Sequence, residues 1–354
     1  MAQSDLWHRV HEFCETYGLD LPLLMAPMAG ASPVALAGAV ADAGGMGACG
    51  ALLMAPDDIA QWAAGFRARS NGAFQMNLWV PDPEPARDPA HEAALAEFLT
   101  QWGPRPEVSD GPLVQDFDAQ FDALLAAGTP VVSTIMGLLT AEQVAALRAR
   151  RMRWFATVTT VAEARAAQSA GADAVIAQGA EAGGHRGSFD AQKAQAQSVG
   201  GLALIPAVVD VVDVPVIAAG GIGDGRAMAA ALVLGASAVM LGTALLRSPE
   251  AGVAPKWADA LSGLAPEDTR LTRAFSGRTG RAVATPYVRA AETGPAPAPY
   301  PVQRALTAPM RAAGEARSMQ MWAGQAAARA RPEPAGQTVT RIWDQAQALL
   351  GSAG

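Results

Sequence analysis

Eight short apolar runs alternate along the chain with segments that have the spacing of amphipathic helices. The runs lack the polar alternation of half-exposed strands, and they are bounded by Gly, Pro or Asn. Such runs are typical of parallel strands that are buried on both faces. The eight predicted strands lie at residues 23–27, 45–51, 73–80, 131–136, 154–158, 174–179, 215–221 and 238–243.

The segments between these strands carry helix start and stop signals. "SPVALAGAVADAGG" offers Ser32 as an N-cap, with Pro33 at the first helical position. "TVAEARAAQSAGAD" offers Thr160 as an N-cap, Glu163 three residues further on, and Gly171 as the stop. We therefore expect helices to connect the strands.

Eight strand–helix units in one chain predict a (β/α)8 TIM barrel, with a doubly wound open sheet as the less favoured alternative. A segment at about residues 81–115 is Pro-rich at both ends and helical between, and is expected to lay a helix over the barrel mouth. The predicted domains are a barrel at residues 1–264 and a C-terminal helical extension at 265–354 that packs on the barrel.

Composition narrows the class of protein. Of the 354 residues, 51% are hydrophobic and 17% charged, which suits a large core and argues against a disordered chain. The net charge of −7 argues against a nucleic-acid partner. The basic cluster "RLTRAFSGRTGR", residues 270–281, is too local to change that, although it could hold a small anion.

Cysteine usage and the apolar runs bear on the cellular compartment. Cys14 and Cys49 cannot form a disulfide framework, and Cys49 is expected to serve packing. No signal-peptide pattern opens the chain, and no run reaches the ~20 apolar residues of a membrane span. We expect a cytoplasmic protein with no membrane partner.

The active site of such a barrel lies at the C-terminal ends of its strands, and the unusual stretches of this chain lie there. "AAGGIGDG" and "GTAL" follow the last two strands, where glycine lets a backbone approach a phosphate closely. The alternative is that these glycines only make tight turns. The amides of Asn77 and Gln178 both donate and accept, which suits the edge of a ring cofactor, or else they cap strand ends.

His185 lies in "AQGAEAGGHRGSF", directly after Gly183-Gly184 and before Arg186-Gly187. Flanking glycines reduce the rigidity of the backbone, which suits a segment that passes close to a ligand. The ordinary pKa of histidine, about 6.5, suits proton transfer at neutral pH. We interpret His185 as catalytic or facing substrate rather than structural. No second His or Cys falls at ligand spacing near it, so no metal site is expected.

An ordered set of motifs resembles the nitronate monooxygenase family, the FMN-dependent barrels formerly called 2-nitropropane dioxygenases. The likeness runs from about residue 20 to 330, and "AQGAEAGGHRG" is its most specific part. The other motifs are "MAPMAG", "QMNLW", "PVIAAGGIGDGRAMAAALVLGASAVMLGTALL", "FSGRTGRA", "YPVQ" and "MWAGQ".

The resemblance implies an FMN-binding barrel in which His185 is the active-site histidine. Two departures concern the substrate more than the cofactor: Thr134 to Met136 replace a histidine and an aromatic residue, and Met240 replaces a common glutamine. The resemblance implies cofactor contacts from Ala26, Pro27, Met28, Asn77, Gln178, Gly183, Gly184, Gly220, Gly221, Met240, Leu241, Gly242, Thr243, Tyr300, Trp322, Gly324 and Gln325.

The activity implied by the resemblance is FMN-dependent oxidation of alkyl nitronates, such as propionate 3-nitronate, with O2 to a carbonyl compound and nitrite. The implied partners are a small substrate and O2, with the chain a monomer or homodimer. FMN-dependent enoyl-acyl-carrier-protein reductase and NAD(P)H:quinone reductase share the barrel and remain alternatives. The first of these usually has "AEG" where this chain has "AQG" at residues 177–179. A phosphate- or flavin-binding protein without turnover is a further alternative.

Overall fold

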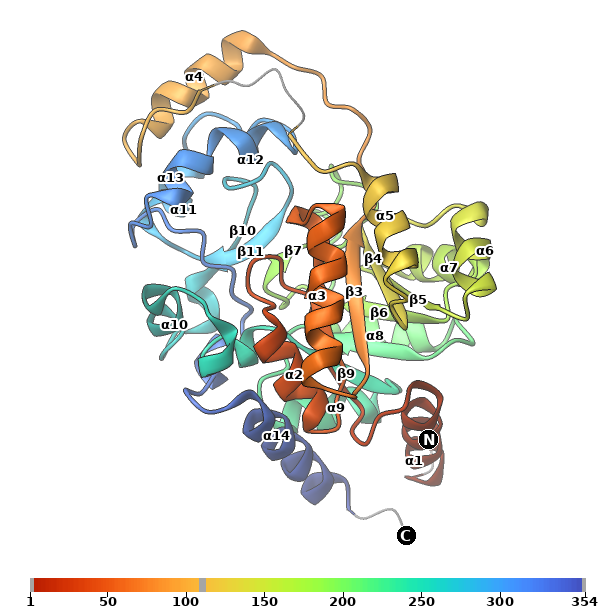
Figure 1. The fold of residues 1–354 in the computed structure, drawn as a ribbon. Helices are drawn as coiled ribbons and strands as arrows, with labels where there is room; N and C mark the ends of the chain where they lie inside the picture. The colour runs from red at the N-terminus through yellow and green to blue at the C-terminus, as the bar shows by residue number, and fades with distance from the viewer. Residues whose placement is uncertain (1–2, 108–112, 352–354) are drawn as a thin grey trace.

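The computed structural model describes residues 3–107 and 113–351 and has eight parallel strands with helices around them (Figure 1). The strands are β1 (Leu23–Met25), β2 (Gly47–Gly50), β3 (Phe74–Trp79), β4 (Val131–Ile135), β5 (Arg153–Val158), β6 (Ala174–Gln178), β8 (Val216–Ala219) and β9 (Ala238–Leu241). The connecting helices are α2 (Val34–Asp42), α3 (Pro56–Arg69), α5 (Phe117–Ala126), α6 (Ala141–Ala149), α7 (Val161–Ala170), α8 (Gly201–Val209) and α9 (Gly225–Val233).

The sheet closes on itself. Its strand order is β1-β9-β8-β6-β5-β4-β3-β2, and the parallel bridge between Leu24 and Met46 joins the first strand to the last. Closure removes the free edges that an open sheet would leave. The predicted (β/α)8 barrel is therefore confirmed, and the open doubly wound sheet is wrong.

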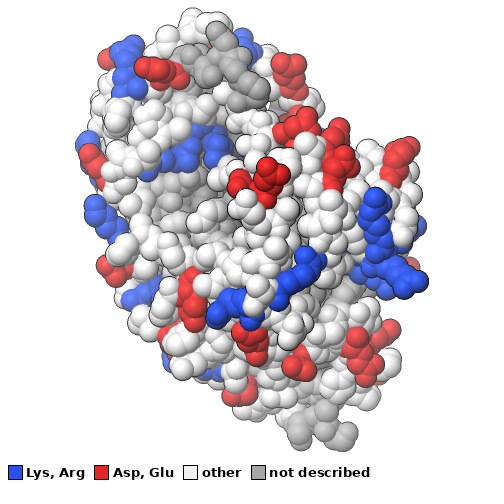
Figure 2. Space-filling view, viewed as in Figure 1, with Lys and Arg blue, Asp and Glu red and all other residues white. Residues whose placement is uncertain are grey.

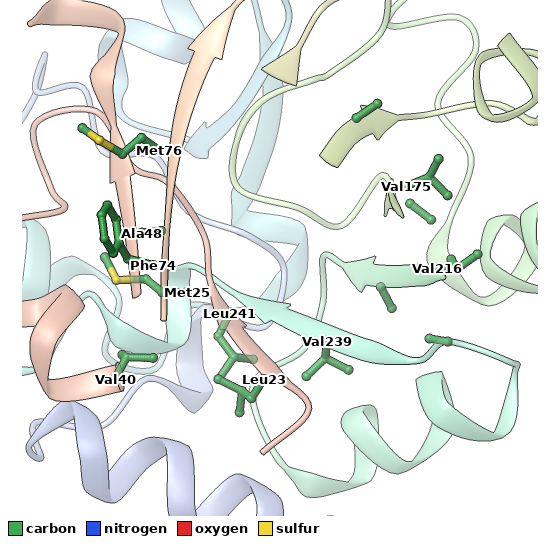
Figure 3. Close-up of a cluster of buried hydrophobic side chains, with 14 of the residues drawn as sticks. Leu23, Met25, Val40, Ala48, Phe74, Met76, Val175, Val216, Val239 and Leu241 are labelled. Carbon is green, nitrogen blue, oxygen red and sulfur yellow. The ribbon is translucent and has the colours of Figure 1, made fainter. Parts of the chain in front are cut away.

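Alternate residues of each barrel strand contribute to two layers of core, as the twofold repeat of a strand requires. Leu23 of β1 and its Cα partner Val239 of β9 belong to the outer layer, between barrel and helices (Figure 3). Leu24 and Met240 belong to the inner layer that fills the barrel. Both layers are mostly apolar, so the strands read as largely apolar runs, although Gln75, Asn77 and Ser133 are buried polar positions in β3 and β4.

The N-terminal and C-terminal helices complete the outside of the barrel. From α1 (Gln3–Tyr17), Phe13 joins the inner layer and Tyr17 meets Phe155 edge-on at 4.9 Å. This helix therefore covers the N-terminal ends of the strands. From α14 (Ala335–Leu350), Val339 and Ile342 belong to the outer layer, and the helix packs across α2 and α9.

The helix signals have mixed outcomes. The N-cap at Thr160 is confirmed, because its hydroxyl accepts from the Glu163 N–H at 3.2 Å, and Gly171 ends the helix at φ 99°. The cap at Ser32 was wrong. Pro33 is the N-cap of α2 and Ser32 bonds instead to the backbone of Met28, where it fixes the turn after β1.

Residues 81–115 contain one described helix, α4 (Pro89–Leu99), as expected. Its position was not as expected: Leu95 and Leu99 join a separate apolar cluster formed with the C-terminal part of the chain, not the barrel mouth itself. In Figure 1, α4 lies beyond the short helices α12 (Val302–Leu306) and α13 (Ala308–Ala312). None of the described residues of 81–115 lines the cavity at the mouth.

The C-terminal extension is not purely helical. Two strands, β10 (Thr269–Thr272) and β11 (Gly280–Val283), pair antiparallel, and β11 also pairs with β7 (Gly184–His185) from the barrel. This three-stranded sheet fastens the extension to the turn after β6. The helices α10 (Pro255–Ala260) and α11 (Pro286–Ala291) flank it. The division at residue 264 remains a prediction.

The structure also bears on membrane-spanning helices and on the two cysteines. Within the described residues, no helix has the length and apolar content needed to cross a bilayer. Cys14 and Cys49 are both buried, and burial raises the pKa of each thiol to about 12. Cys49 thus occupies a packing position, as expected.

A substitution of Phe66 in α3 tests how much the outer apolar layer contributes to stability. The Phe66 side chain is fully buried, with ring centroids 5.6 Å from Trp62 and 4.6 Å from Phe74. Phe66→Ala is expected to lower the free energy of unfolding by roughly 3–5 kcal/mol, because lost contacts and a residual cavity add. Urea unfolding checks this against Leu202→Ala, a change at a 76% exposed side chain that should leave the midpoint in place. Equal midpoint shifts in the two variants would contradict the assignment.

Candidate active site

A cavity of about 240 Å³ lies where the C-terminal ends of the barrel strands meet the extension. We expected the residues at the strand ends to form the site, and most of the residues singled out from the sequence do line this cavity. They are Ala26, Pro27, Met28, Asn77, Gln178, Gly183, Gly184, His185, Gly220, Gly221, Met240, Gly242, Thr243, Trp322 and Gly324.

Three residues singled out from the sequence do not line this cavity. Leu241 is fully buried in the outer layer, since it alternates with Met240 along β9. Tyr300 packs against Trp79 with the two rings tilted, at a centroid distance of 5.5 Å. Gln325 donates its N–H to the Glu181 carbonyl at 2.9 Å and faces a neighbouring groove.

The turns after β8 and β9 form a cradle of backbone N–H groups. Gly220 and Gly221 have φ of 104° and 71°, a region that other residues rarely adopt. The N–H groups of Gly220, Gly221 and Gly242 donate no hydrogen bond to any described residue, although all three line the cavity. Unsatisfied N–H groups that converge on one cavity form a site for an anion.

A close backbone approach joins the barrel to the extension beside this cradle. A Cβ placed on Gly183 would lie 2.5 Å from the Gly324 nitrogen and 2.7 Å from the Ala323 carbonyl carbon. The Gly324 N–H donates to the Thr243 hydroxyl at 3.0 Å. Only a residue without a side chain fits at position 183, so this glycine serves packing rather than flexibility.

The two amides are used differently. Asn77 is buried at the end of β3 and donates to the Ser133 hydroxyl at 3.1 Å. Gln178 donates to the His185 carbonyl at 2.9 Å and accepts from the Gly187 N–H at 2.9 Å. The amide of Gln178 therefore holds the backbone on both sides of Arg186 and positions His185.

His185 is held more firmly than its glycine neighbours suggest. It lies in β7, where it pairs with Gly280 of β11, and Gly184 before it takes φ of 75°. Its ring nitrogen Nε2 is 2.7 Å from the Ser276 hydroxyl. The reduced backbone rigidity expected from the glycines is therefore not seen: Gly184 allows a tight path, and the pairing of β7 with β11 holds the backbone of His185.

The surroundings of His185 keep its imidazole neutral. Trp79 and Trp322 approach the ring edge-on, each at a centroid distance of 4.6 Å. Burial lowers the pKa of His185 from 6.5 to about 3, with further contributions from the charges of Arg278, Arg304 and Arg311. The imidazole is therefore unprotonated at neutral pH, and the free lone pair of its ring can accept a hydrogen bond.

The basic cluster at residues 270–281 bonds to the protein itself. Arg278 is almost fully buried and pairs with Asp82 of the inserted segment at 2.8 Å. Arg281 donates to the Ala180 carbonyl and to the Thr269 hydroxyl. These guanidinium groups therefore connect the extension to the insertion and to the turn after β6. Few of their N–H groups remain to bind a small anion.

Several residues of the site were not singled out from the sequence. Trp79, Ser276, Arg304, Arg311 and Gln320 lie at the cavity wall or contact His185. Trp79 lies within "QMNLW", Ser276 lies within "FSGRTGRA" and Arg304 follows "YPVQ", so the motifs marked these segments without indicating the individual residues. Of the departures at residues 134–136, only Ile135 lines the cavity.

The described residues contain no group of three His, Cys, Asp or Glu side chains that could hold a metal ion. The chemistry available to the site therefore rests on a neutral imidazole, a backbone anion cradle and two tryptophans. A closed (β/α)8 barrel with a cavity at the C-terminal ends of its strands is typical of barrel enzymes, whose active sites lie at that end.

Comparison with known proteins gives the family within that class. A family model described as "Nitronate monooxygenase" matches residues 12–344. The "Probable nitronate monooxygenase" of Staphylococcus aureus (strain Newman) is 32% identical over 358 residues, covering 98% of this chain and 99% of the relative. The chain belongs to the nitronate monooxygenase family and is an oxidoreductase.

Solved structures support this placement. The nitroalkane oxidase of Streptomyces ansochromogenes is 39% identical with a TM-score of 0.86, covering 93% of this chain and 97% of that one. FabK from Thermotoga maritima is 27% identical with a TM-score of 0.75, covering 96% of each chain. The likeness to nitroalkane oxidase is the greater in both identity and superposition.

The lowered pKa of His185 predicts a pH-dependent stability. Between about pH 6.5 and 3 the unfolded imidazole binds a proton that the folded one does not, so acidification favours the unfolded state. The free energy of unfolding of the wild type should therefore fall more steeply over this range than that of His185→Asn. Urea titrations at several pH values measure the two slopes, with His8→Asn on α1 as a control for the loss of one histidine. Parallel slopes for wild type and His185→Asn would refute the assignment.

Proposed function

We propose that this chain oxidises alkyl nitronates with O2, using FMN, to give a carbonyl compound and nitrite. The observation that carries the proposal is a neutral His185 imidazole in the same cavity as a cradle of unsatisfied backbone N–H groups. Membership of the nitronate monooxygenase family supports the reaction class. A cytoplasmic location and a monomeric or homodimeric state remain predictions.

The residues at the cavity fit FMN. The N–H groups of Gly220, Gly221 and Gly242 would hold its phosphate, because they donate no hydrogen bond within the described residues and all three glycines line the cavity. The ring would lie toward Asn77 and the turn at residues 26–28, whose side chains are small or flexible. When bound, FMN supplies the electron-accepting group that the protein side chains lack.

His185 binds and orients the substrate beside that ring. When Ser276 donates its proton to the Arg278 carbonyl, 3.2 Å away, its oxygen accepts from His185 Nε2–H. The lone pair then lies on Nδ1, the atom that would take the α-proton of a neutral nitroalkane. A nitronate is already deprotonated, so for that substrate the imidazole serves binding rather than proton removal.

Trp79 and Trp322 exclude water from the region around the imidazole. Their rings contact His185 on two sides, and both line the cavity. Exclusion of water strengthens the interaction between an anionic substrate and the fixed dipoles of the site. The aromatic wall thus supports recognition of a small anion.

A reductase of the same barrel fold is the second candidate, and the likeness to FabK supports it. A nitronate oxidase requires no nicotinamide, whereas an enoyl-acyl-carrier-protein or quinone reductase does. Anaerobic mixing with NADH or NADPH separates them, because rapid bleaching of a bound flavin would favour a reductase.

The proposal predicts a yellow protein that consumes O2. The purified chain should show flavin absorption, release FMN on denaturation, and take up O2 with propionate 3-nitronate in the absence of NADH. Nitrite formed in the same assay gives an independent count of turnover. A colourless protein that does not bind added FMN, or one that leaves O2 constant across a panel of nitronates and nitroalkanes, would overturn the proposal.

His185→Asn separates proton removal from cofactor binding. The variant should retain flavin and lose turnover of neutral nitroalkanes by roughly 10²–10⁴-fold, the usual contribution of a general base. Oxidation of preformed nitronates should fall less, because no proton has to be removed. Steady-state O2 uptake with nitroethane and with its nitronate tests this, and His8→Asn on the far end of the barrel is the matched control. Full activity of His185→Asn on nitroethane would exclude the role.

A further inference from the structure

The cavity has an uncompensated positive wall. Among the described residues that line it, Arg304 of α12 and Arg311 of α13 are charged, and no Asp, Glu or Lys lines it. Figure 2 shows a hollow on this face of the molecule, with Lys or Arg side chains on its inner wall. Both arginines come from the extension, opposite the glycine cradle of the barrel.

Neither guanidinium group has a carboxylate partner within the described residues. Arg311 donates to the Thr307 hydroxyl at 3.2 Å and to the Arg304 carbonyl at 2.9 Å. It also reaches the Gln320 side-chain oxygen at 3.4 Å. The guanidinium of Arg304 makes no hydrogen bond or ion pair within the described part of the chain. Burial, followed by the nearby charge of Arg304, lowers the pKa of Arg311 to about 10.

This arrangement is costly without an anion. Two like charges on a partly buried wall repel each other, and each loses hydration. The contrast is Arg278, which also acts on His185 but is paired with Asp82. Arg304 and Arg311 therefore present positive charge to the interior of the cavity, within electrostatic reach of His185.

We propose that Arg304 and Arg311 form a subsite for a second anionic group of the substrate, a carboxylate at the end of a short nitronate opposite its reacting carbon. This rests on the proposed function. The cofactor phosphate has its own N–H cradle on the barrel side of the cavity, so these arginines are left for substrate. Two guanidinium groups match a substrate that carries two negative charges better than one that carries a single charge.

The size and lining of the cavity favour a small dianion. FMN would occupy much of the cavity of about 240 Å³, which leaves room for only a short chain between the two anionic groups. The cavity lining also includes the apolar side chains of Trp79, Ile135 and Trp322, which suit an aliphatic link. A planar carboxylate accepts two parallel hydrogen bonds from a guanidinium group. The specificity thus assigned is for carboxylate-bearing nitronates over uncharged ones.

The test compares two substrates of the flavin-loaded enzyme, propionate 3-nitronate and ethylnitronate. Arg304→Gln and Arg311→Gln should each lower kcat/KM for propionate 3-nitronate by about 10–100-fold, the effect of one charge-assisted hydrogen bond, and change kcat/KM for ethylnitronate by less than about threefold. Arg304→Lys should recover part of the loss. Arg289→Gln, which removes an arginine paired with Asp268 outside the cavity, is the charge-matched control.

A binding measurement tests the arginine subsite independently of whether the enzyme oxidises nitronates. Succinate mimics propionate 3-nitronate without reacting, and its binding can be followed by flavin absorption or fluorescence. Wild type should bind it at least tenfold more tightly than Arg304→Gln, and this result would support the subsite even if no nitronate were oxidised. Equal succinate affinity in the two proteins, or an equal loss of kcat/KM for both nitronates, would overturn the subsite while leaving nitronate oxidation intact.

Discussion

The site depends on one close approach between two backbones. Gly183, after β6, lies against Gly324 of the extension at a distance that no side chain could share, and Thr243 bonds to the same Gly324. This contact brings the turns after β6 and β9 and the extension to one place. The cavity is the space that remains between these three segments where they meet.

The barrel could be predicted from the sequence because its causes are local. Each strand is a largely apolar run, and signals such as the Thr160 cap and the Gly171 stop lie next to the helix that they begin or end. The strand-end glycines and His185 could be found for the same reason, since loops at one end of a barrel converge by topology. Ser32 shows the limit: a hydroxyl can bond backward to Met28 as well as forward to a helix.

The rest of the site comes from contacts distant in sequence. The pairing of β7 with β11 joins residues about a hundred positions apart. A strand of two residues is too short to show a pattern of alternating side chains in the sequence. Ser276 reaches His185 only because of that pairing. Arg304 and Arg311 lie on short helices whose sequence gives no sign that they face a cavity. Tertiary pairing, rather than local propensity, places all of these.

The sheet that fastens the extension has a consequence for how this kind of enzyme diversifies. The barrel supplies the cradle, while the extension supplies Trp322 and the two arginines of the opposite wall. Because these walls come from different stretches of chain, substitutions in the extension can change which molecules the cavity accepts without altering the glycine turns of the barrel. Ligand preference in such a molecule can therefore change independently of the barrel itself.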